Sequence, residues 1–378
     1  MTSWAPRGTG DPVVDGWVAV HQAQEWTAER LDQPTWDYVR SGAGDEATLR
    51  DNELAWSRHR LLPHVMTDVT GLDTSIELFG QRRSHPIITA PTATHLRYHP
   101  DGEKATLSGA AAGDAITTIS TLASLSVDEV GRVATEHGAD WWLQVYVQHD
   151  REFTWEFCTR AVAAGARALV VTVDTPSLGA RDLDKRSASG AASGVTFPNL
   201  PAQSHQDEST PAHRRIWNPH LANNLTTADL TVLREQVDVP ILAKGILRPD
   251  DAGRAIDAGA QGIIVSNHGG RNLDTVPATA DVLGSIVQAA HKADPTVPVL
   301  VDGGIRRGTD IAVALSLGAT AVLVGRPIIW GLATYGASGV RHVIEILRTE
   351  LEMAMALLGA SQISQLGTDL INPSHQCD

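Results

Sequence analysis

The chain has 378 residues, of which 42% are hydrophobic and 20% are charged, as in globular proteins that bury a large core. Its formal net charge of -14 argues against nucleic acid or an anionic membrane as a partner. Only two cysteines occur, Cys158 and Cys377, which argues against a disulfide framework and a cysteine-rich metal site, and we expect no metal. Because no apolar run reaches about 18 residues and Met1–Val14 lacks a secretion-signal pattern, we expect a cytoplasmic protein.

The first 84 residues contain one helical stretch near Ala28–Ser41, followed by the loop Ser41-Gly42-Ala43-Gly44-Asp45. A regular alternation of apolar and amphipathic segments starts only at His85. We therefore predict that residues 1–84 form a tail and an accessory helical cap. Residues 85–378 are predicted to form the body of the same domain, with a final helix over Val340–Leu358.

Eight short apolar runs alternate with helical stretches from His85 onward. The runs are His85–Ala93, Ile116–Ala123, Asp140–Val147, Ala168–Pro176, Val239–Ile246, Gly262–Gly270, Pro298–Ile305 and Ala321–Ile329. The helical stretches include Gly102–Gly113, Ser126–His137, Phe153–Gly165, Thr227–Gln236, Pro249–Gly259 and Gly308–Gly318. This alternation predicts an α/β protein with an eight-stranded parallel β/α (TIM) barrel. An open doubly wound sheet is the alternative, but the first run lacks the G-x-G-x-x-G turn of that fold.

Polar and charged residues interrupt these apolar runs near their C-terminal ends. They are Thr92, Ser120, Gln144, Tyr146, Thr172, Asp174, Lys244, Ser266, His268, Asp302 and Arg326. In a parallel barrel the C-terminal ends of all strands meet at one face, where barrel enzymes place their active sites. The pattern therefore predicts a functional site at that face.

The connection from Ser177 to Thr226 is about fifty residues long, whereas about two to six residues are usual in β/α units. It leaves the fourth run, which carries Thr172 and Asp174. We predict that this loop after the fourth strand is a lid over the site. Its low-complexity segment Ser187–Gly194 is predicted to be mobile in the free protein.

The segment Ser266-Asn267-His268-Gly269-Gly270-Arg271 places a base and a cation on one short loop. The imidazole of His268 can accept a proton near neutral pH. The guanidinium of Arg271 can hold a carboxylate through two parallel hydrogen bonds. Asp174 is the candidate that orients His268 and stabilises its protonated form.

A second group of residues predicts an anion site. Asp302-Gly303-Gly304-Ile305-Arg306 comes after the seventh predicted strand, and Gly325-Arg326-Pro327 comes after the eighth. Glycines let backbone N–H groups approach phosphate oxygens, and barrels often place a phosphate site after strands seven and eight. The two segments therefore predict a phosphorylated cofactor or substrate.

Lys244 closes an apolar run, and a lysine there is costly to bury unless it faces an anion or an electron-accepting group. Two roles stay open for it, a Schiff base or the stabilisation of negative charge on a reduced flavin.

Gln144 and Tyr146 share one face of their strand, because side chains alternate with a period of two. Such a pair suits a flavin edge or a substrate carboxylate.

With these motifs the chain resembles the FMN-dependent L-2-hydroxy acid oxidases and dehydrogenases, the group of glycolate oxidase, lactate oxidase and hydroxymandelate oxidase. The resemblance covers Trp36 to Leu358. Its motifs are Tyr38 before Ser41-Gly42-Ala43, Ala90-Pro91-Thr92-Ala93, Gln144-Val145-Tyr146, Thr172-Val173-Asp174-Thr175-Pro176 with Leu178-Gly179 and Arg181, Lys244-Gly245, Ser266 to Arg271, and Asp302-Gly303-Gly304. Asn272 stands where the family usually has glutamine.

The resemblance implies FMN as cofactor and a role for each matching residue. His268 would be the base with Asp174 behind it, and Lys244 would stabilise the reduced flavin. The substrate carboxylate would be bound by Arg181, Arg271, Tyr38 and Tyr146. The flavin ring and ribityl chain would contact Pro91, Thr92, Ala93, Ser120, Gln144, Thr172 and Ser266. The ribityl and phosphate end would be held by Asp302, Gly304, Arg306, Gly325 and Arg326.

We therefore expect oxidation of an L-2-hydroxy acid to the 2-keto acid, with oxygen reduced to hydrogen peroxide. A hydroxyl-proton route and a carbanion route would use the same residues. One alternative is a dehydrogenase that passes electrons to a quinone or a cytochrome, and another is a non-catalytic barrel that binds a phosphorylated ligand. Leu122, in place of a bulkier aromatic residue, and the loop His95-Leu96-Arg97-Tyr98 favour mandelate-like or medium-sized substrates. The resemblance also implies a homotetramer.

Overall fold

The computed structural model describes residues 16–186, 196–201 and 216–372. Eight parallel strands form a closed barrel in the order β10-β3-β4-β5-β6-β7-β8-β9. They are β3 (Ile87–Thr89), β4 (Ile116–Ser120), β5 (Trp141–Val145), β6 (Leu169–Thr172), β7 (Ile241–Ile246), β8 (Gly262–Val265), β9 (Val299–Val301) and β10 (Ala321–Val324). One strand falls within each of the eight predicted runs, so the predicted barrel is confirmed. Its closure between β10 and β3 excludes the open sheet.

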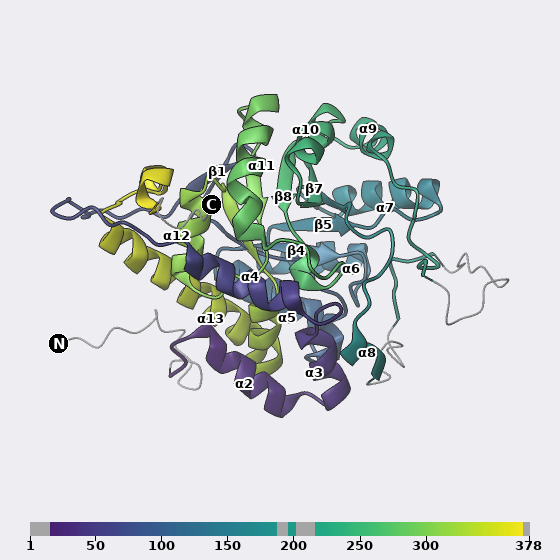
Figure 1. Cartoon of the computed structure of the whole chain (residues 1–378). Coiled ribbons are helices and arrows are strands. Elements are labelled where there is room, and N and C mark those ends of the chain that lie inside the picture. Colours follow the sequence, from purple (N-terminus) through teal and green to yellow (C-terminus); the bar gives the residue numbers. More distant parts are fainter. Residues whose placement is uncertain (1–15, 187–195, 202–215, 373–378) are drawn as a thin grey trace.

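The helices form a layer around the strands (Figure 1). Those that follow successive strands are α5 (Gly102–Ala112), α6 (Val127–His137), α7 (Arg151–Ala163), α9 (Thr227–Gln236), α10 (Pro249–Asp257), α11 (Thr279–Ala293), α12 (Gly308–Ser316) and α13 (Arg326–Leu358). Their ends are set by local chemistry. The hydroxyl of Ser126 accepts from the amide of Glu129 to begin α6, and Gly138 ends it in a left-handed conformation.

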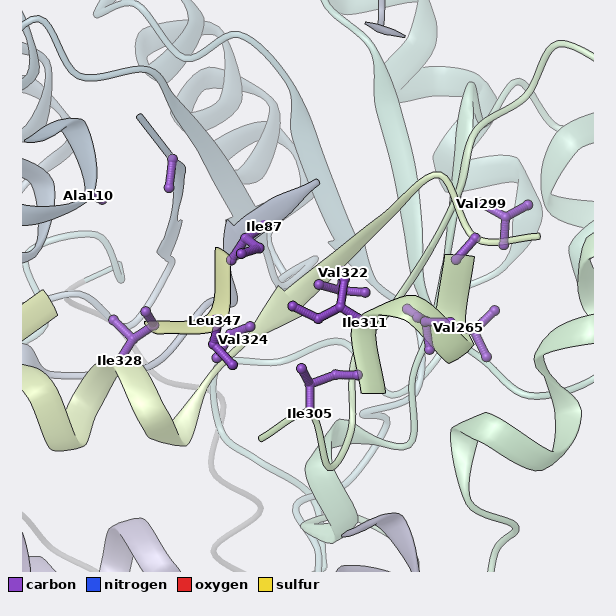
Figure 2. Close-up of a cluster of buried hydrophobic side chains, with 14 of the residues drawn as sticks. Ile87, Ala110, Val265, Val299, Ile305, Ile311, Val322, Val324, Ile328 and Leu347 are labelled. Carbon is purple, nitrogen blue, oxygen red and sulfur yellow. The ribbon is translucent and has the colours of Figure 1, made fainter. Parts of the chain in front are cut away.

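The strands are buried on both faces, which explains why they read as continuous apolar runs rather than alternating ones. One set of side chains fills the barrel interior and includes Ile88, Ile116, Trp142, Val170, Leu242, Ile264, Leu300 and Leu323. The other faces the helices. Figure 2 shows part of it, where Ile87, Val322 and Val324 of neighbouring strands lie near Ile311 of α12 and Ile328 of α13.

The N-terminal region differs from the prediction. The helical stretch predicted near Ala28–Ser41 is divided between two helices, α2 (Val20–Arg30) and α3 (Gln33–Arg40), and starts earlier than predicted. The break arises because Asp32 caps α3 by accepting from the amide of Thr35 at 2.8 Å, and a proline lies in the first turn. Three further elements precede the barrel, namely α4 (Ala47–Arg58) and the hairpin of β1 (Ile76–Leu78) and β2 (Gln81–Arg83). The boundary at residue 84 stays a prediction.

The eighth run also differs from the prediction. Strand β10 ends at Val324, and α13 begins only two residues later at Arg326, with Pro327 in its first turn. The predicted helix Val340–Leu358 is thus the second half of a longer one, which is kinked at Tyr335 and Gly336. Gly336 has a φ of 58°, and a Cβ there would lie 2.9 Å from His99 Nε2.

The long connection after β6 starts with the short helix α8 (Asp182–Arg186). Its predicted mobile segment, Ser187–Gly194, lies outside the described residues. Farther along, the returning chain packs against the loop after β5, where Ala222 N donates to Val147 O at 2.9 Å.

Short 3-10 helices complete the described fold: η1 (His95–Arg97), η3 (His268–Gly270), η4 (Ile363–Gln365) and η5 (Thr368–Leu370). Within the described ranges, no helix combines the length and apolarity of a membrane span.

Candidate active site

A row of buried polar side chains runs around the C-terminal rim of the barrel. Strand register sets it, because Ser120 of β4 pairs with Gln144 of β5, and Thr172 of β6 pairs with Lys244 of β7. Ser120 Oγ donates to Gln144 Oε1 at 3.1 Å, and Gln144 Nε2 donates to Thr172 Oγ1 at 2.9 Å. The structure therefore brings these predicted cofactor residues together on adjacent strands.

Lys244 continues the row toward β8 and β9. Its ammonium lies 2.8 Å from Asp302 Oδ2 and donates to Ser266 Oγ at 2.8 Å. The lysine is buried, so its charge is balanced by the carboxylate of Asp302. This arrangement places a fixed positive charge at the barrel mouth, as expected for a group that stabilises negative charge on a ligand.

His268 and Asp174 form a hydrogen-bonded pair at the barrel mouth. His268 Nδ1 lies 3.0 Å from Asp174 Oδ1, and His268 Nε2 lies 3.3 Å from the hydroxyl of Tyr146. The backbone of His268 has a φ of 58°, an unfavourable value for a residue with a side chain, and the following glycine is also left-handed. This tight turn directs the imidazole toward Asp174 in the loop after β6. Because Asp174 occupies Nδ1, Nε2 is the atom available to take a proton.

The surroundings of the pair keep Asp174 ionised. Burial pushes the pKa of Asp174 upward, but the charge and hydrogen bond of His268 and the charge of Lys244 outweigh it. The pKa of Asp174 is therefore lowered overall. By contrast, burial, followed by the negative charge of Asp174, raises the pKa of Tyr146 far above its ordinary value, so its phenol stays protonated.

Two arginines flank Tyr38 of α3 near the dyad. The guanidinium carbons of Arg271 and Arg181 lie 5.0 Å and 5.6 Å from the centre of the Tyr38 ring. Arg271 Nη1 donates to the backbone oxygens of Tyr38 and Ser41, both at 2.8 Å. Burial and the charge of Arg181 lower the pKa of Arg271. Two like charges held this close favour an anionic ligand such as a carboxylate.

Arg306 and Arg326 are the two arginines of the predicted anion cradle. Arg306 Nη2 lies 2.6 Å from Glu53 Oε1 of α4, a contact that the sequence did not predict. Arg326 begins α13 and donates to the backbone oxygens of Val39, Ser41 and Gly269, each at 3.1 Å. Burial and the charges of the neighbouring arginines lower the pKa of Arg326 to about 9. The cradle thus concentrates positive charge at a helix N-terminus, where phosphates bind.

Two buried atoms beside this cradle have no hydrogen-bond partner among the described residues. They are Asp302 Oδ1 and Arg306 Nε. Buried polar atoms are nearly always paired, so unpaired ones indicate a ligand or water. A carboxylate oxygen suits the hydroxyls of a ribityl chain, and a guanidinium N–H suits a phosphate oxygen. The residues present therefore fit a flavin mononucleotide.

Gly304 sets how closely the loop after β9 approaches α4. It has a φ of 81°, and a Cβ there would lie 2.0 Å from Asn52 O. We expect Gly304→Ala to lower the free energy of unfolding by at least about 2 kcal/mol, because strain and overlap add. Chemical denaturation of the purified protein measures this change.

The matched control for this prediction is Gly284→Ala in α11, where a Cβ would meet nothing within 4 Å. It should leave stability unchanged or raise it by up to about 1 kcal/mol, because alanine favours helix over glycine. Equal stabilities of the Gly304→Ala variant and the unsubstituted protein would show that α4 moves aside without cost.

Other residues of the site had no clear signal in the sequence. Arg97 lies 4.5 Å from the ring centre of Tyr38, although it is far from Tyr38 along the chain. Asn52 and Asn267 exchange amide hydrogen bonds of 2.9 and 2.7 Å and join α4 to the loop after β8. Pro91, Thr92 and Ala93 follow β3 as predicted, and Thr92 Oγ1 lies 2.6 Å from His95 Nε2, a partner that was not expected.

Fold and site together define a class: a parallel barrel whose strand ends gather a histidine–carboxylate pair, a lysine and an arginine cradle, as in barrel enzymes that bind a phosphorylated cofactor. The sequence profile of the FMN-dependent dehydrogenase family matches residues 27–373. The chain therefore belongs to that family. The predicted family and its FMN cofactor are confirmed.

Several characterised proteins are similar over nearly their whole length. A peroxisomal (S)-2-hydroxy-acid oxidase from Oryza sativa subsp. japonica is 42% identical, with 92% of this chain and 94% of the relative covered. An L-lactate oxidase from Nostoc sp. is 40% identical, with 94% and 98% covered. The crystal structure of mandelate oxidase with (S)-4-hydroxymandelic acid has a TM-score of 0.85 at 36% identity and covers 94% of this chain and 98% of its own. The predicted enzyme class, an FMN-dependent 2-hydroxy acid oxidase, agrees with these relatives.

Proposed function

We propose that the protein oxidises an L-2-hydroxy acid to the 2-keto acid with oxygen as the electron acceptor. The observation that carries this proposal is the hydrogen-bonded pair of His268 and Asp174 beside Tyr146, which is also near the arginines that flank Tyr38. A base and a carboxylate clamp this close together suit a substrate with a hydroxyl group beside a carboxylate. A non-catalytic barrel would need the anion cradle alone.

His268 Nε2 would take the proton of the substrate hydroxyl. Asp174 accepts from Nδ1 and so keeps Nε2 unprotonated before the reaction and stabilises the imidazolium after it. The hydroxyl of Tyr146, 3.3 Å from Nε2, stays protonated and can donate to the substrate. Its donor character helps to orient the substrate beside the base.

Arg271 and Arg181 would bind the substrate carboxylate, assisted by the hydroxyl of Tyr38. Arg271 uses Nη1 for the backbone of the cap, which fixes the plane of its guanidinium and leaves its other N–H groups for the ligand. Fixing the carboxylate in this way sets the distance between the substrate hydroxyl and His268.

Bound FMN supplies the acceptor for the electron pair that leaves the substrate carbon. Its ring would be held by the rim row together with Pro91, Thr92, Ala93 and Ser266, and its ribityl and phosphate end by Asp302, Gly304, Arg306, Gly325 and Arg326. Lys244 would balance the negative charge that develops there, because its ammonium is fixed in a buried position.

Oxygen as acceptor is supported by the relatives, which are named as oxidases. We expect the purified protein to be yellow, to release FMN on denaturation and to be bleached by a 2-hydroxy acid without oxygen. Admitting air should restore the colour and form hydrogen peroxide in proportion. Release of another cofactor would contradict the assignment, and recovery that needs a quinone or a cytochrome would favour a dehydrogenase.

We further propose a mandelate-like or medium-sized substrate. Leu122 follows β4 and is partly buried. Because a leucine side chain is smaller than an aromatic one, it leaves more room there. Mandelate oxidase is among the similar structures. Comparing bleaching by glycolate, lactate, mandelate and 4-hydroxymandelate tests this, and a clear preference for glycolate would contradict it.

The assembly and location are proposed from the family resemblance. We propose a homotetramer, which light scattering of the purified holoenzyme tests directly. A cytoplasmic location stays a prediction, because some relatives are named as peroxisomal enzymes.

A further inference from the structure

A chain of hydrogen bonds reaches the pair of His268 and Asp174 on the side of Asp174 Oδ1. Asn272 Nδ2 lies 2.8 Å from Thr175 Oγ1 and 3.0 Å from the backbone oxygen of Asp174. Thr175 Oγ1 in turn lies 2.9 Å from Asp174 Oδ1. Asn272 belongs to the loop after β8, whereas Asp174 and Thr175 belong to the loop after β6. The chain therefore joins the two loops that carry the pair.

The chemistry of the partners fixes the direction of each hydrogen bond. The backbone oxygen of Asp174 can only accept, so the group of Asn272 that faces it must be the amide nitrogen. The same nitrogen donates to Thr175 Oγ1. The single hydroxyl proton of Thr175 is then directed at the carboxylate, which can only accept.

This direction matters for His268. Its Nδ1 lies 3.4 Å from Thr175 Oγ1 and 3.0 Å from Asp174 Oδ1. If the hydroxyl proton pointed at Nδ1, the imidazole would need its own proton on Nε2 and could not act as a base there. With the hydroxyl proton on Asp174, Nδ1–H donates to the carboxylate and Nε2 stays free.

We propose that Asn272 is a positioning residue that acts through Thr175 on Asp174 and so keeps the free lone pair of the imidazole on His268 Nε2. The inference rests on the proposed role of His268 as the base. Asn272 stands at the position where the family resemblance predicts glutamine, so this chain of contacts is a property of the present sequence.

The effect on pH dependence follows from the groups that face Asp174. These are His268 from the loop after β8, Lys244 from β7 and Tyr146 from β5, together with the hydroxyl of Thr175. A hydrogen bond donated to a carboxylate stabilises its charged form and so lowers the basicity of the carboxylate. Removing the Thr175 donor makes Asp174 a stronger hydrogen-bond acceptor for the imidazolium, which favours the protonated form of His268 in the variant. Only the neutral imidazole is a base, so the rate of flavin reduction falls at low pH. We call this fall the acid limb of the pH profile, and in the variant it must move to higher pH.

The test measures the rate of anaerobic flavin reduction against pH in the purified holoenzyme. We expect Thr175→Val to move the acid limb upward by about half a pH unit or more, the scale of one lost hydrogen bond. Asn272→Ala should move it in the same direction by less, and should add no shift when combined with Thr175→Val. Thr175→Ser, the matched control, keeps the hydroxyl and should leave the limb in place.

An unmoved acid limb in both Thr175→Val and Asn272→Ala would overturn the proposal. If Thr175→Val does not fold, Asn272→Ala decides, because that side chain is only half-buried. If no 2-hydroxy acid bleaches the wild-type flavin, the proposed function fails instead. The pH dependence of His268 acylation by diethylpyrocarbonate, followed by mass spectrometry, then tests the same shift without a substrate.

Discussion

Replacing His268 with alanine is expected to slow reduction of the bound flavin by a 2-hydroxy acid by about a hundredfold or more. The variant loses the base at 3.3 Å from the Tyr146 hydroxyl, and positioned general bases contribute about a hundredfold to ten-thousandfold. FMN should remain bound, since the arginine cradle lies on other loops. Stopped-flow absorbance under anaerobic conditions measures the rate, and the flavin-to-protein ratio measures retention.

His137→Ala is the control, because this histidine is exposed in the last turn of α6, away from the barrel mouth. It should reduce its flavin at the wild-type rate. Wild-type rates in His268→Ala as well would remove the imidazole from the mechanism. Loss of the flavin in that variant would instead show that His268 holds the cofactor.

Arg271→Lys is expected to weaken substrate binding by about tenfold or more. An ammonium cannot keep two hydrogen bonds to the backbone of Tyr38 and Ser41 and also present two parallel donors to a carboxylate. Charge-assisted hydrogen bonds contribute about 1.5–3 kcal/mol, and 1.4 kcal/mol corresponds to a factor of ten. The dependence of the reduction rate on substrate concentration gives the apparent dissociation constant.

Arg248→Lys is the matched control for this substitution, because Arg248 forms an exposed ion pair with Asp250 on the outer surface. It should leave the dissociation constant unchanged. If Arg271→Lys also binds substrate as the wild type does, the carboxylate must be held by Arg181 and the tyrosines alone.

The strands were predictable because each is buried on both faces and therefore reads as one apolar run. The end of β10 could not be predicted from this apolar pattern, because α13 starts after Gly325 and continues with the apolar residues Ile328 and Ile329. The break between α2 and α3 depends on one cap, Asp32, inside an otherwise helical composition. Local chemistry of single residues therefore decided the boundaries that hydrophobic pattern alone could not predict.

Candidate site residues were predictable where they lie in or just after the C-terminal part of a strand, as Lys244, Asp174 and His268 do. The contacts that join the N-terminal helices to the barrel have no corresponding pattern in the sequence. The stacking of Arg97 on Tyr38 and the paired amides of Asn52 and Asn267 join positions with no periodic relation in the sequence. Only the folded chain brings them together, so they could not be inferred from spacing.

The buried arginines also link the cofactor to the folding of the chain. Burial lowers the pKa of Arg271, Arg306 and Arg326, and the charges of Arg271 and Arg306 lower the pKa of Arg326 further. An anion that binds only the folded chain stabilises it by mass action, in proportion to the logarithm of its concentration over its dissociation constant. FMN therefore acts as a folding partner as well as a redox group. We therefore expect the amount of folded protein to depend on the supply of FMN as well as on expression of the chain.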